Sequence, residues 1–256
     1  MAALSALKPK PAVRPHVTAI ASGKGGVGKT WFAVTLAHAL ADQHHRVLLF
    51  DGDLGLANVD IQLGVTPAHD LGAVLAGRVT LEEAAMKIDG AGFDLLAGRS
   101  GSGALAALPE AALADVLAGL PALPYDHVLL DLGAGLDAAT RRMAAGANTL
   151  LVLATDEPTS LTDAYAVIKL NAADAPDADV RIVVNLAAGP AAGQRTYATL
   201  ARACARFLGH TPRLAGIVRR DPRVTDAIRH QTPLLTRHPN TQAASDVRQI
   251  AIGLED

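Results

Sequence analysis

The chain has 256 residues, of which 50% are hydrophobic and only 3% aromatic, so it can bury a large aliphatic core in one compact domain. Its single cysteine, Cys204, cannot form an intrachain disulfide, and its net charge of −2 is close to neutral. No apolar run reaches the roughly 18 residues of a membrane span, and the N-terminus lacks the apolar stretch of a secretory signal; these features exclude a disulfide-stabilised secreted protein, and we expect a cytoplasmic one.

Strands and helices alternate along most of the chain. Residues 1–16 contain three prolines and scattered basic residues, so we expect a flexible N-terminal arm there and a single domain over 17–256. The predicted strands are 17–21, 47–50, 93–96, 128–131, 150–154, 181–185 and 214–218. The predicted helices are 31–42, 80–88, 109–119, 137–147, 158–171, 193–208, 222–231 and 242–253.

Nearly all of these strands are continuous apolar runs, which is typical of strands covered on both faces. The pattern therefore predicts an α/β fold with a doubly wound, mostly parallel sheet flanked by helices. Ligands in such sheets bind beyond the carboxyl ends of the strands. Candidate functional residues are accordingly sought in the segments that follow each strand.

The segment after the first predicted strand reads Gly-Lys-Gly-Gly-Val-Gly-Lys-Thr over residues 23–30. Backbone N–H groups in such a turn converge on phosphate oxygens, and the helix that follows adds positive potential. We expect Lys29 to reach the β- and γ-phosphates of a nucleoside triphosphate, and the Thr30 hydroxyl to bind Mg²⁺. A ligand-free glycine turn is the alternative. The residues expected to contact the nucleotide here are Gly23, Lys24, Gly25, Gly26, Val27, Gly28, Lys29, Thr30 and Trp31.

Three carboxylates follow two further predicted strands. Asp51 and Asp53 come directly after the second strand, where Asp51 can hold Mg²⁺ through its hydration shell and Asp53 can orient the attacking water. Asp131 ends an apolar strand and precedes Gly133-Ala-Gly135, the arrangement of a Walker B aspartate followed by a mobile loop that senses the γ-phosphate. A surface Asp-Gly turn is the alternative for the first pair.

Together these motifs resemble the MinD/ParA family of deviant Walker A ATPases, over about residues 17–252. Within that family the chain is most similar to the FlhG/FleN regulators of flagellar number. The segments that carry this similarity are 51–60, 157–169, 206–209 and 221–224. The resemblance implies a P-loop ATPase domain that binds ATP or ADP with Mg²⁺, hydrolyses ATP slowly and forms an ATP-dependent homodimer. Lys24 matches the family's extra lysine, which reaches across the dimer to the partner's phosphates, so the implied catalytic residues are Lys24, Lys29 and Asp53.

The same resemblance implies a base pocket and protein partners. Asn185, at the end of a predicted strand, is similar to the asparagine that contacts adenine, and Arg220 and Asp221 lie in the loop similar to the second wall of that pocket. A loop asparagine that closes a strand is the alternative for Asn185. The implied partners are a flagellar-assembly GTPase, switch components or a transcription regulator. We expect the partner to bind the face of helices 137–147 and 158–171, because these helices follow the Walker B strand and the Glu157-Pro158 turn and can respond to the γ-phosphate. Nothing in residues 1–16 matches the helix by which many members activate the GTPase.

Basic residues gather in the C-terminal quarter, where the stretch 195–237 contains only Asp221 and Asp226 as acidic residues. They are Arg195, Arg202, Arg206, Arg213, Arg219, Arg220, Arg223, Arg229 and Arg237. Such a bias can attract nucleic acid, so a ParA-like DNA-binding partition ATPase is one alternative function. MinD-like positioning of cell division and a scaffold that binds nucleotide without hydrolysis are the others. Only two aromatic residues, Tyr197 and Phe207, lie among these arginines, which favours a solvated helix face.

The C-terminus carries a short apolar stripe that ends in Glu255-Asp256. The stripe consists of Val247, Ile250, Ala251 and Leu254. It lacks the basic residues and large aromatics of a membrane-targeting helix, so we expect no stable membrane binding. Polar or peripheral recruitment through a partner is left open.

Overall fold

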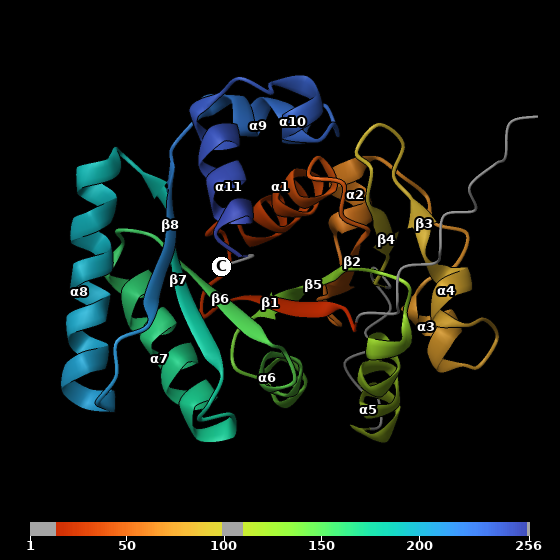
Figure 1. Cartoon of the computed structure of the whole chain (residues 1–256), viewed down its shortest axis with the longest axis horizontal. Coiled ribbons are helices and arrows are strands. Elements are labelled where there is room, and N and C mark those ends of the chain that lie inside the picture. Colours follow the sequence, from red (N-terminus) through yellow and green to blue (C-terminus); the bar gives the residue numbers. More distant parts are fainter. Residues whose placement is uncertain (1–13, 99–109, 255–256) are drawn as a thin grey trace, which may run out of the picture.

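One eight-stranded sheet organises the computed structural model, which describes residues 14–98 and 110–254 (Figure 1). The strand order is β3-β4-β2-β5-β1-β6-β7-β8, and every pair is parallel except β3 with β4. The strands are β1 (His16–Ser22), β2 (Val47–Gly52), β3 (Met86–Lys87), β4 (Asp94–Leu96), β5 (His127–Ala134), β6 (Thr149–Ala154), β7 (Asp179–Ala187) and β8 (Arg213–Arg219). All seven predicted strands are present, and the predicted fold class is confirmed. Residues 1–13 of the expected flexible arm lie outside the described residues.

The helix predicted over 80–88 is wrong in its second half. A capping box between Thr80 and Glu83 starts α4 (Leu81–Ala84), as the local sequence favours. The chain then turns extended and forms β3, which pairs with the edge of the sheet. Tertiary pairing has overridden local helix propensity here.

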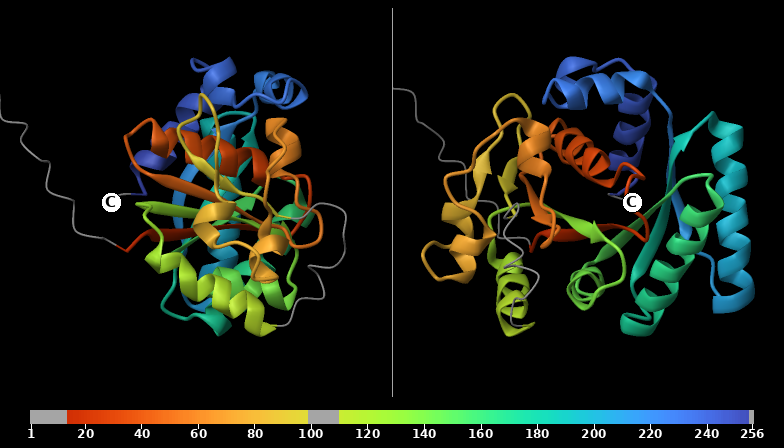
Figure 2. Two further views of the ribbon diagram at one scale, coloured as in Figure 1. Left: turned by 90° about the vertical axis from the view of Figure 1, so that its right-hand side faces the viewer. Right: turned by 180° about the vertical axis from the view of Figure 1, so that it is seen from behind.

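The helices cover both faces of the sheet (Figure 2). They are α1 (Lys29–Ala41), α2 (Val59–Leu63), α3 (Leu71–Leu75), α4, α5 (Glu110–Gly119), α6 (Ala138–Ala145), α7 (Pro158–Asp174), α8 (Pro190–Leu208), α9 (Pro222–Arg229), α10 (Leu234–Arg237) and α11 (Gln242–Ile252), with a 3-10 turn at Leu120–Ala122. The sequence missed α2, α3 and α10, because one-turn helices are too short to show a period of 3.6 residues.

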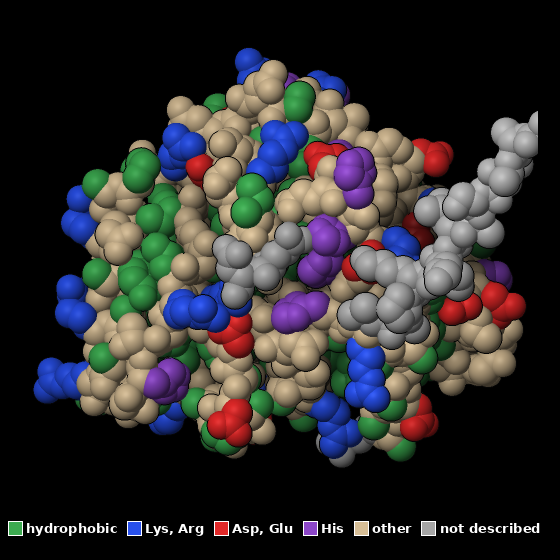
Figure 3. Space-filling view, viewed as in Figure 1, with side chains coloured by type: hydrophobic (Ala, Val, Ile, Leu, Met, Phe, Trp, Pro, Cys, Tyr) green, Lys and Arg blue, Asp and Glu red, His purple; other side chains and the backbone are tan. Residues whose placement is uncertain are grey.

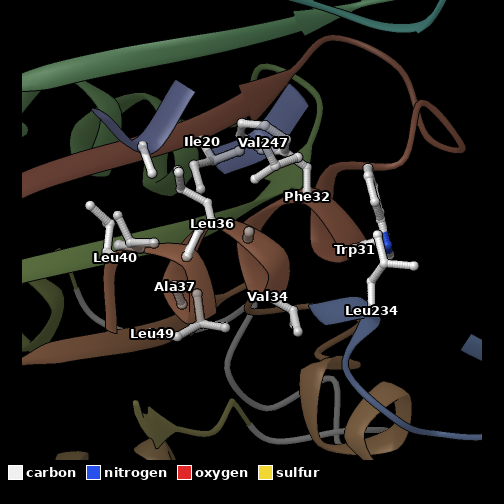
Figure 4. Close-up of a cluster of buried hydrophobic side chains, with 14 of the residues drawn as sticks. Ile20, Trp31, Phe32, Val34, Leu36, Ala37, Leu40, Leu49, Leu234 and Val247 are labelled. Atoms are coloured by element: carbon white, nitrogen blue, oxygen red, sulfur yellow. The ribbon is translucent and has the colours of Figure 1, made fainter. Parts of the chain in front are cut away.

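Successive residues of the central strand belong to different halves of the core. Ile20 packs with α1, α10 and α11 on one face, whereas Ala19 and Ala21 pack with α5 to α8 on the other. Helix α1 is buried over every residue from Trp31 to Leu40, since the sheet lies on one side of it and α10 and α11 on the other (Figure 4). This position fixes the N-terminal end of α1 against the loop that precedes it.

The C-terminal apolar stripe belongs to this core. Val247, Ile250, Ala251 and Leu254 are all buried, and α11 contacts both α1 and β8. Gly216 allows the close approach, because a Cβ there would collide with Ile250. The stripe is therefore not a surface that a bilayer could contact. Within the described ranges, no helix combines the length and apolarity required to cross a membrane.

Candidate functional site

The predicted phosphate loop lies between β1 and α1, at the carboxyl edge of the sheet. Gly26 and Gly28 have φ angles of 81° and 86°, a left-handed conformation that favours glycine. Gly28 is also the N-cap of α1, and no side chain caps this helix end. The first turn of α1 thus keeps backbone N–H groups for an anion.

The side chain of Trp31 lies away from the loop, and contact of this residue with a nucleotide stays a prediction. Its side chain is only 4% exposed and packs in the core beside Leu234 of α10 (Figure 4). Only its backbone remains at the helix end that faces the loop. Because it is the only tryptophan of the chain and stands in the first turn of the helix after the loop, we expect its fluorescence to change when a nucleotide binds.

Lys29 and Asp131 meet beneath the loop. Lys29 Nζ lies 3.4 Å from Asp131 Oδ1, and both side chains are largely buried. Burial raises the pKa of the Asp131 carboxyl, and the Lys29 charge and a hydrogen bond from Thr30 oppose that rise. The structure therefore brings together the lysine, the hydroxyl and the carboxylate that the motifs predicted. The Thr30 hydroxyl and the Asp131 carboxylate are oxygen ligands that suit Mg²⁺, an ion that keeps several waters and needs few protein ligands.

Asp51 lies beside Asp131, since the two residues are in register on neighbouring strands. Burial raises the pKa of Asp51 to about 7, and the charge of Asp131 adds to the rise. Its carboxylate accepts backbone N–H bonds from Asp53 at 3.2 Å, from Asn58 at 2.9 Å and from Val59 at 3.0 Å. Asp51 thus anchors the whole loop after β2, a role that sequence reasoning missed. The only sign of this role in the sequence was that residues 51–60 carry part of the family resemblance.

Asp53 begins the loop after β2 and lies against the end of β5. Its Oδ1 accepts from Gly55 N at 3.2 Å and Leu56 N at 2.9 Å, and a Cβ on Gly133 would be 3.4 Å from its carboxyl group. Within the described part of the chain, Oδ2 of Asp53 takes part in no hydrogen bond. The carboxyl group also lines a cavity of about 490 Å³ between the two loops and α6. Its placement suits the predicted orientation of a water.

Lys24 is bound to the start of α7. Its Nζ lies 2.6 Å from Glu157 Oε2 and 3.1 Å from Thr159 Oγ1, and its side chain is 39% exposed. The hydrogen bond from Lys24 lowers the pKa of the Glu157 carboxyl. Since ion pairs at exposed positions are weak, this contact can be exchanged for another at small cost. Sequence reasoning did not foresee this contact within the same chain.

Asn185 braces the phosphate loop. Its Nδ2 donates to the Val27 carbonyl at 2.7 Å, and its Oδ1 accepts from Leu186 N at 2.9 Å. A Cβ on Gly28 would lie 2.6 Å from the same Nδ2, so the loop and the amide are in close contact. The amide is buried, and contact with a base stays a prediction.

Arg220 and Asp221, which are expected to form the second wall of the base pocket, also make structural hydrogen bonds. Arg220 N donates to the Ala187 carbonyl at 2.8 Å, and Asp221 accepts from Arg223 N at 2.9 Å as the cap of α9. Both residues follow β8 at the carboxyl edge, as predicted. Their contact with a nucleotide stays a prediction.

Comparisons with known proteins agree with a nucleotide site at this edge of the sheet. A family model for the CobQ/CobB/MinD/ParA nucleotide binding domain matches residues 18–234. The antiactivator FleN of Pseudomonas aeruginosa is 35% identical over 238 residues, covering 92% of this chain and 85% of that protein. The flagellum site-determining protein YlxH of Helicobacter pylori is 34% identical over 189 residues, covering 71% and 62%.

Solved structures of MinD proteins share the fold. MinD of Pyrococcus horikoshii complexed with Mg-ADP superposes with a TM-score of 0.79 at 25% identity, covering 94% of this chain and 96% of that one. The MinC:MinD complex of Aquifex aeolicus gives a TM-score of 0.74 at 25% identity, covering 94% and 95%.

The contacts of Asn185 lead to a prediction that separates bracing of the loop from recognition of the base. Asn185→Ala leaves the buried Val27 carbonyl without its donor, a change worth about 1–3 kcal/mol. We expect the affinity for ATP and for inorganic tripolyphosphate to fall alike, by roughly tenfold or more. Titration of Trp31 fluorescence measures both, with Gln194→Ala, an exposed amide on α8, as the control. A loss confined to ATP would assign Asn185 to the base.

Proposed function

The chain belongs to the CobQ/CobB/MinD/ParA nucleotide-binding family, and from this membership we propose that it is an ATP-dependent dimerising switch with slow, Mg²⁺-dependent ATP hydrolysis. We further propose that the switch regulates flagellar number or placement. The similarity to FleN, which covers 92% of the chain, supports the flagellar assignment over a role in cell division. The observation that carries the switch itself is the pair of lysines in the phosphate loop, one buried beside Asp131 and the other exposed.

The buried lysine and its neighbours suit the phosphates of the chain's own nucleotide. Lys29 and the N–H groups at the start of α1 would neutralise and orient the phosphates. Thr30, Asp131 and Asp51 would hold Mg²⁺, which supplies further positive charge to the phosphate oxygens. Asp53 would orient the attacking water through the oxygen that its loop leaves free.

The exposed lysine is the basis of the proposed dimer. Lys24 points to Glu157 rather than to the phosphate side of its own loop, and their exposed ion pair is easily exchanged. ATP in a second copy would offer Lys24 a stronger counter-charge. We propose that closure of the ATP dimer draws Lys24 away from Glu157 and thereby changes the start of α7.

The proposed partner is a protein bound on the face of α6 and α7. Gly135 N donates to Ser22 O at 3.2 Å, so the loop that leads to α6 is joined to the strand that leads to the phosphate loop. Helix α7 contacts the loop directly, because a Cβ on Gly23 would collide with the Asp163 backbone. Both helices can therefore respond to the nucleotide without any rearrangement of the core.

The arginines of the C-terminal quarter give less support to DNA binding. The side chain of Arg219 forms two hydrogen bonds with Asp246, at 2.6 and 2.9 Å, and Arg237 binds Asp226 at 2.6 Å. Arg213 is paired with Asp179. The others are divided between the outer side of α8, at the left margin of Figure 3, and α9 with the turn before it. Their division between two helices gives no support to one continuous track for a phosphate backbone.

Lys24→Ala tests the dimer. We expect the variant to bind ATP and to lose ATP-dependent dimerisation, because this lysine contacts α7 rather than its own phosphate site. Light scattering with and without ATP measures the dimer, and Trp31 fluorescence measures binding. Lys87→Ala, an exposed lysine on β3, is the matched control. A Lys24→Ala protein that dimerises like the parent would remove the sandwich dimer from the proposal.

Asp53 variants test the catalytic step. Asp53→Asn keeps an oxygen that can accept from Gly55 N and Leu56 N, whereas Asp53→Ala loses it. We expect both to slow phosphate release by ~10²-fold or more and to hold the ATP dimer closed, since neither can orient water as a carboxylate does. Single-turnover phosphate release is the measurement, with Asp60→Ala as the control. Normal release by Asp53→Asn would show that the carboxylate only shapes the loop.

Charge reversals distinguish a protein partner from DNA. We expect Lys169→Glu, on the exposed side of α7, to reduce ATP-dependent capture of a flagellar GTPase, switch protein or transcription regulator used as bait. The double variant Arg223→Glu/Arg229→Glu on α9 is the control; Arg219 is left intact because of its pairing with Asp246. Retention of the parent on DNA, falling steeply with salt and lost only in the arginine variant, would support the ParA-like alternative.

A further inference from the structure

Helices α2 and α9 contact each other near their carboxyl ends, although they are far apart in the sequence. Helix α2 is capped by Gly64 and α9 is followed by Gln231, and both residues have left-handed φ angles, of 67° and 49°. Gln231 Nε2 donates to the Ile61 carbonyl at 2.7 Å. A Cβ on Gly64 would lie 2.9 Å from the Cβ of Gln231, so the glycine allows the two helix ends to approach. The side chain of Gln231 thus joins α9 to α2.

Gln231 occupies a position where glycine is usual. Its N–H donates to the Ile228 carbonyl at 3.0 Å, and the Thr232 N–H donates to the Ala227 carbonyl at 3.1 Å, which together form a Schellman motif after α9. The left-handed residue of this motif is commonly glycine, because a Cβ is disfavoured in that conformation. A side chain kept in a strained backbone conformation suggests a role for that side chain. Here the side chain supplies the bond to α2.

Helix α2 leads directly to the candidate catalytic loop. The N–H groups of Asn58 and Val59, at the start of this helix, donate to the Asp51 carboxylate at 2.9 and 3.0 Å. The helix has only five residues, and Val59 and Leu63 are buried in the cluster that surrounds α1. A shift at the carboxyl end of so short a helix therefore reaches its other end. The loop that carries Asp53 is held there.

Helix α9 leads to the other side of the nucleotide site. Asp221 caps this helix by accepting from Arg223 N at 2.9 Å, and Asp221 and Arg220 are the residues predicted to form one wall of the base pocket. The helix has eight residues, and its Ala227 is buried in the same cluster as α2. A rigid element thus runs from the predicted base pocket to Gln231.

We propose that Gln231 is a positioning residue that makes ATP hydrolysis depend on the presence of the base. Contact of the base with the loop after β8 would favour one placement of α9. The bond from Gln231 would then hold α2, and with it Asp51 and Asp53, in the arrangement that orients the attacking water. A nucleotide shifts such an equilibrium only by its difference in affinity for the two arrangements, so a triphosphate without a base would leave it unshifted. This inference rests on the proposed ATP hydrolysis and on the predicted base contact.

Two substitutions separate the amide from the backbone strain. Gln231→Gly removes the side chain from a left-handed position, so we expect it to unfold at no lower temperature than the parent. Gln231→Glu keeps the size of the side chain, but its carboxylate cannot donate to the Ile61 carbonyl. Both variants therefore lose the bond, one of them without any strain. Gln43→Glu is the matched control, because Gln43 Nε2 donates to the Ala39 carbonyl at 3.2 Å near the far end of α1.

Single-turnover phosphate release, from saturating Mg-ATP and from saturating inorganic tripolyphosphate with Mg²⁺, is the measurement. We expect the parent to release phosphate faster from ATP than from tripolyphosphate. Both Gln231 variants should lose about threefold to tenfold of the rate with ATP, the size expected of one hydrogen bond, and none of the rate with tripolyphosphate. Trp31 fluorescence should show an unchanged affinity for ATP, and Gln43→Glu should behave like the parent with both compounds.

Four results would overturn the inference. Equal rates of the parent with ATP and tripolyphosphate would show that there is no dependence on the base, and would leave the proposed hydrolysis intact. Variants that match the parent would show that the bond is not used. An equal loss with both compounds, or a loss in Gln231→Glu alone, would assign the effect to general structure or to the added charge. A parent that releases no phosphate from ATP would remove the proposed hydrolysis and this inference together.

Discussion

The pairing of two buried carboxylates at the ends of neighbouring strands determines how this site is built. Asp51 and Asp131 are in register, and burial raises the pKa of both. Two such groups are tolerated only with compensating charges and hydrogen bonds. Lys29 provides the charge for Asp131, and three backbone N–H groups provide the hydrogen bonds for Asp51. The position of the loop after β2, and with it the placement of Asp53 and Leu56, follows from this compensation.

The phosphate loop itself is held from two sides by elements that are distant in sequence. Asn185 of β7 binds the Val27 carbonyl, and α7 packs against Gly23 so closely that no side chain would fit there. The glycines of this loop therefore have two purposes: some allow its turn, and others allow these neighbours to approach. A loop clamped in this way can transmit a change at the phosphates to β7 and α7 without moving as a whole.

The sequence predicted the elements whose signals are local and left out those that depend on contacts. All seven apolar strands and the phosphate loop were predicted, since buried parallel strands and glycine-rich turns have distinctive patterns. The edge strand β3 was missed because only its pairing with β4 makes it a strand. For the same reason, the brace formed by Asn185 and the contact between Lys24 and Glu157 could not be predicted: each joins residues that are more than 130 positions apart.

The ion pairs of the protein are of two kinds: some are joined by several hydrogen bonds, and one is exposed and easily exchanged. Arg219 and Asp246 are joined by three hydrogen bonds, and Arg141 and Asp174 by two that tie α6 to α7. The pair of Lys24 with Glu157 has a single ionic contact and lies in solvent. A contact that must break during each cycle has to be weak, since a ligand shifts an equilibrium only by its difference in affinity for the two states. In the proposed dimer Lys24 reaches the phosphates of the other protomer, and of the three pairs its ion pair with Glu157 is the most easily exchanged. Helices α6 and α7, which would respond to the nucleotide, stay joined by Arg141 and Asp174.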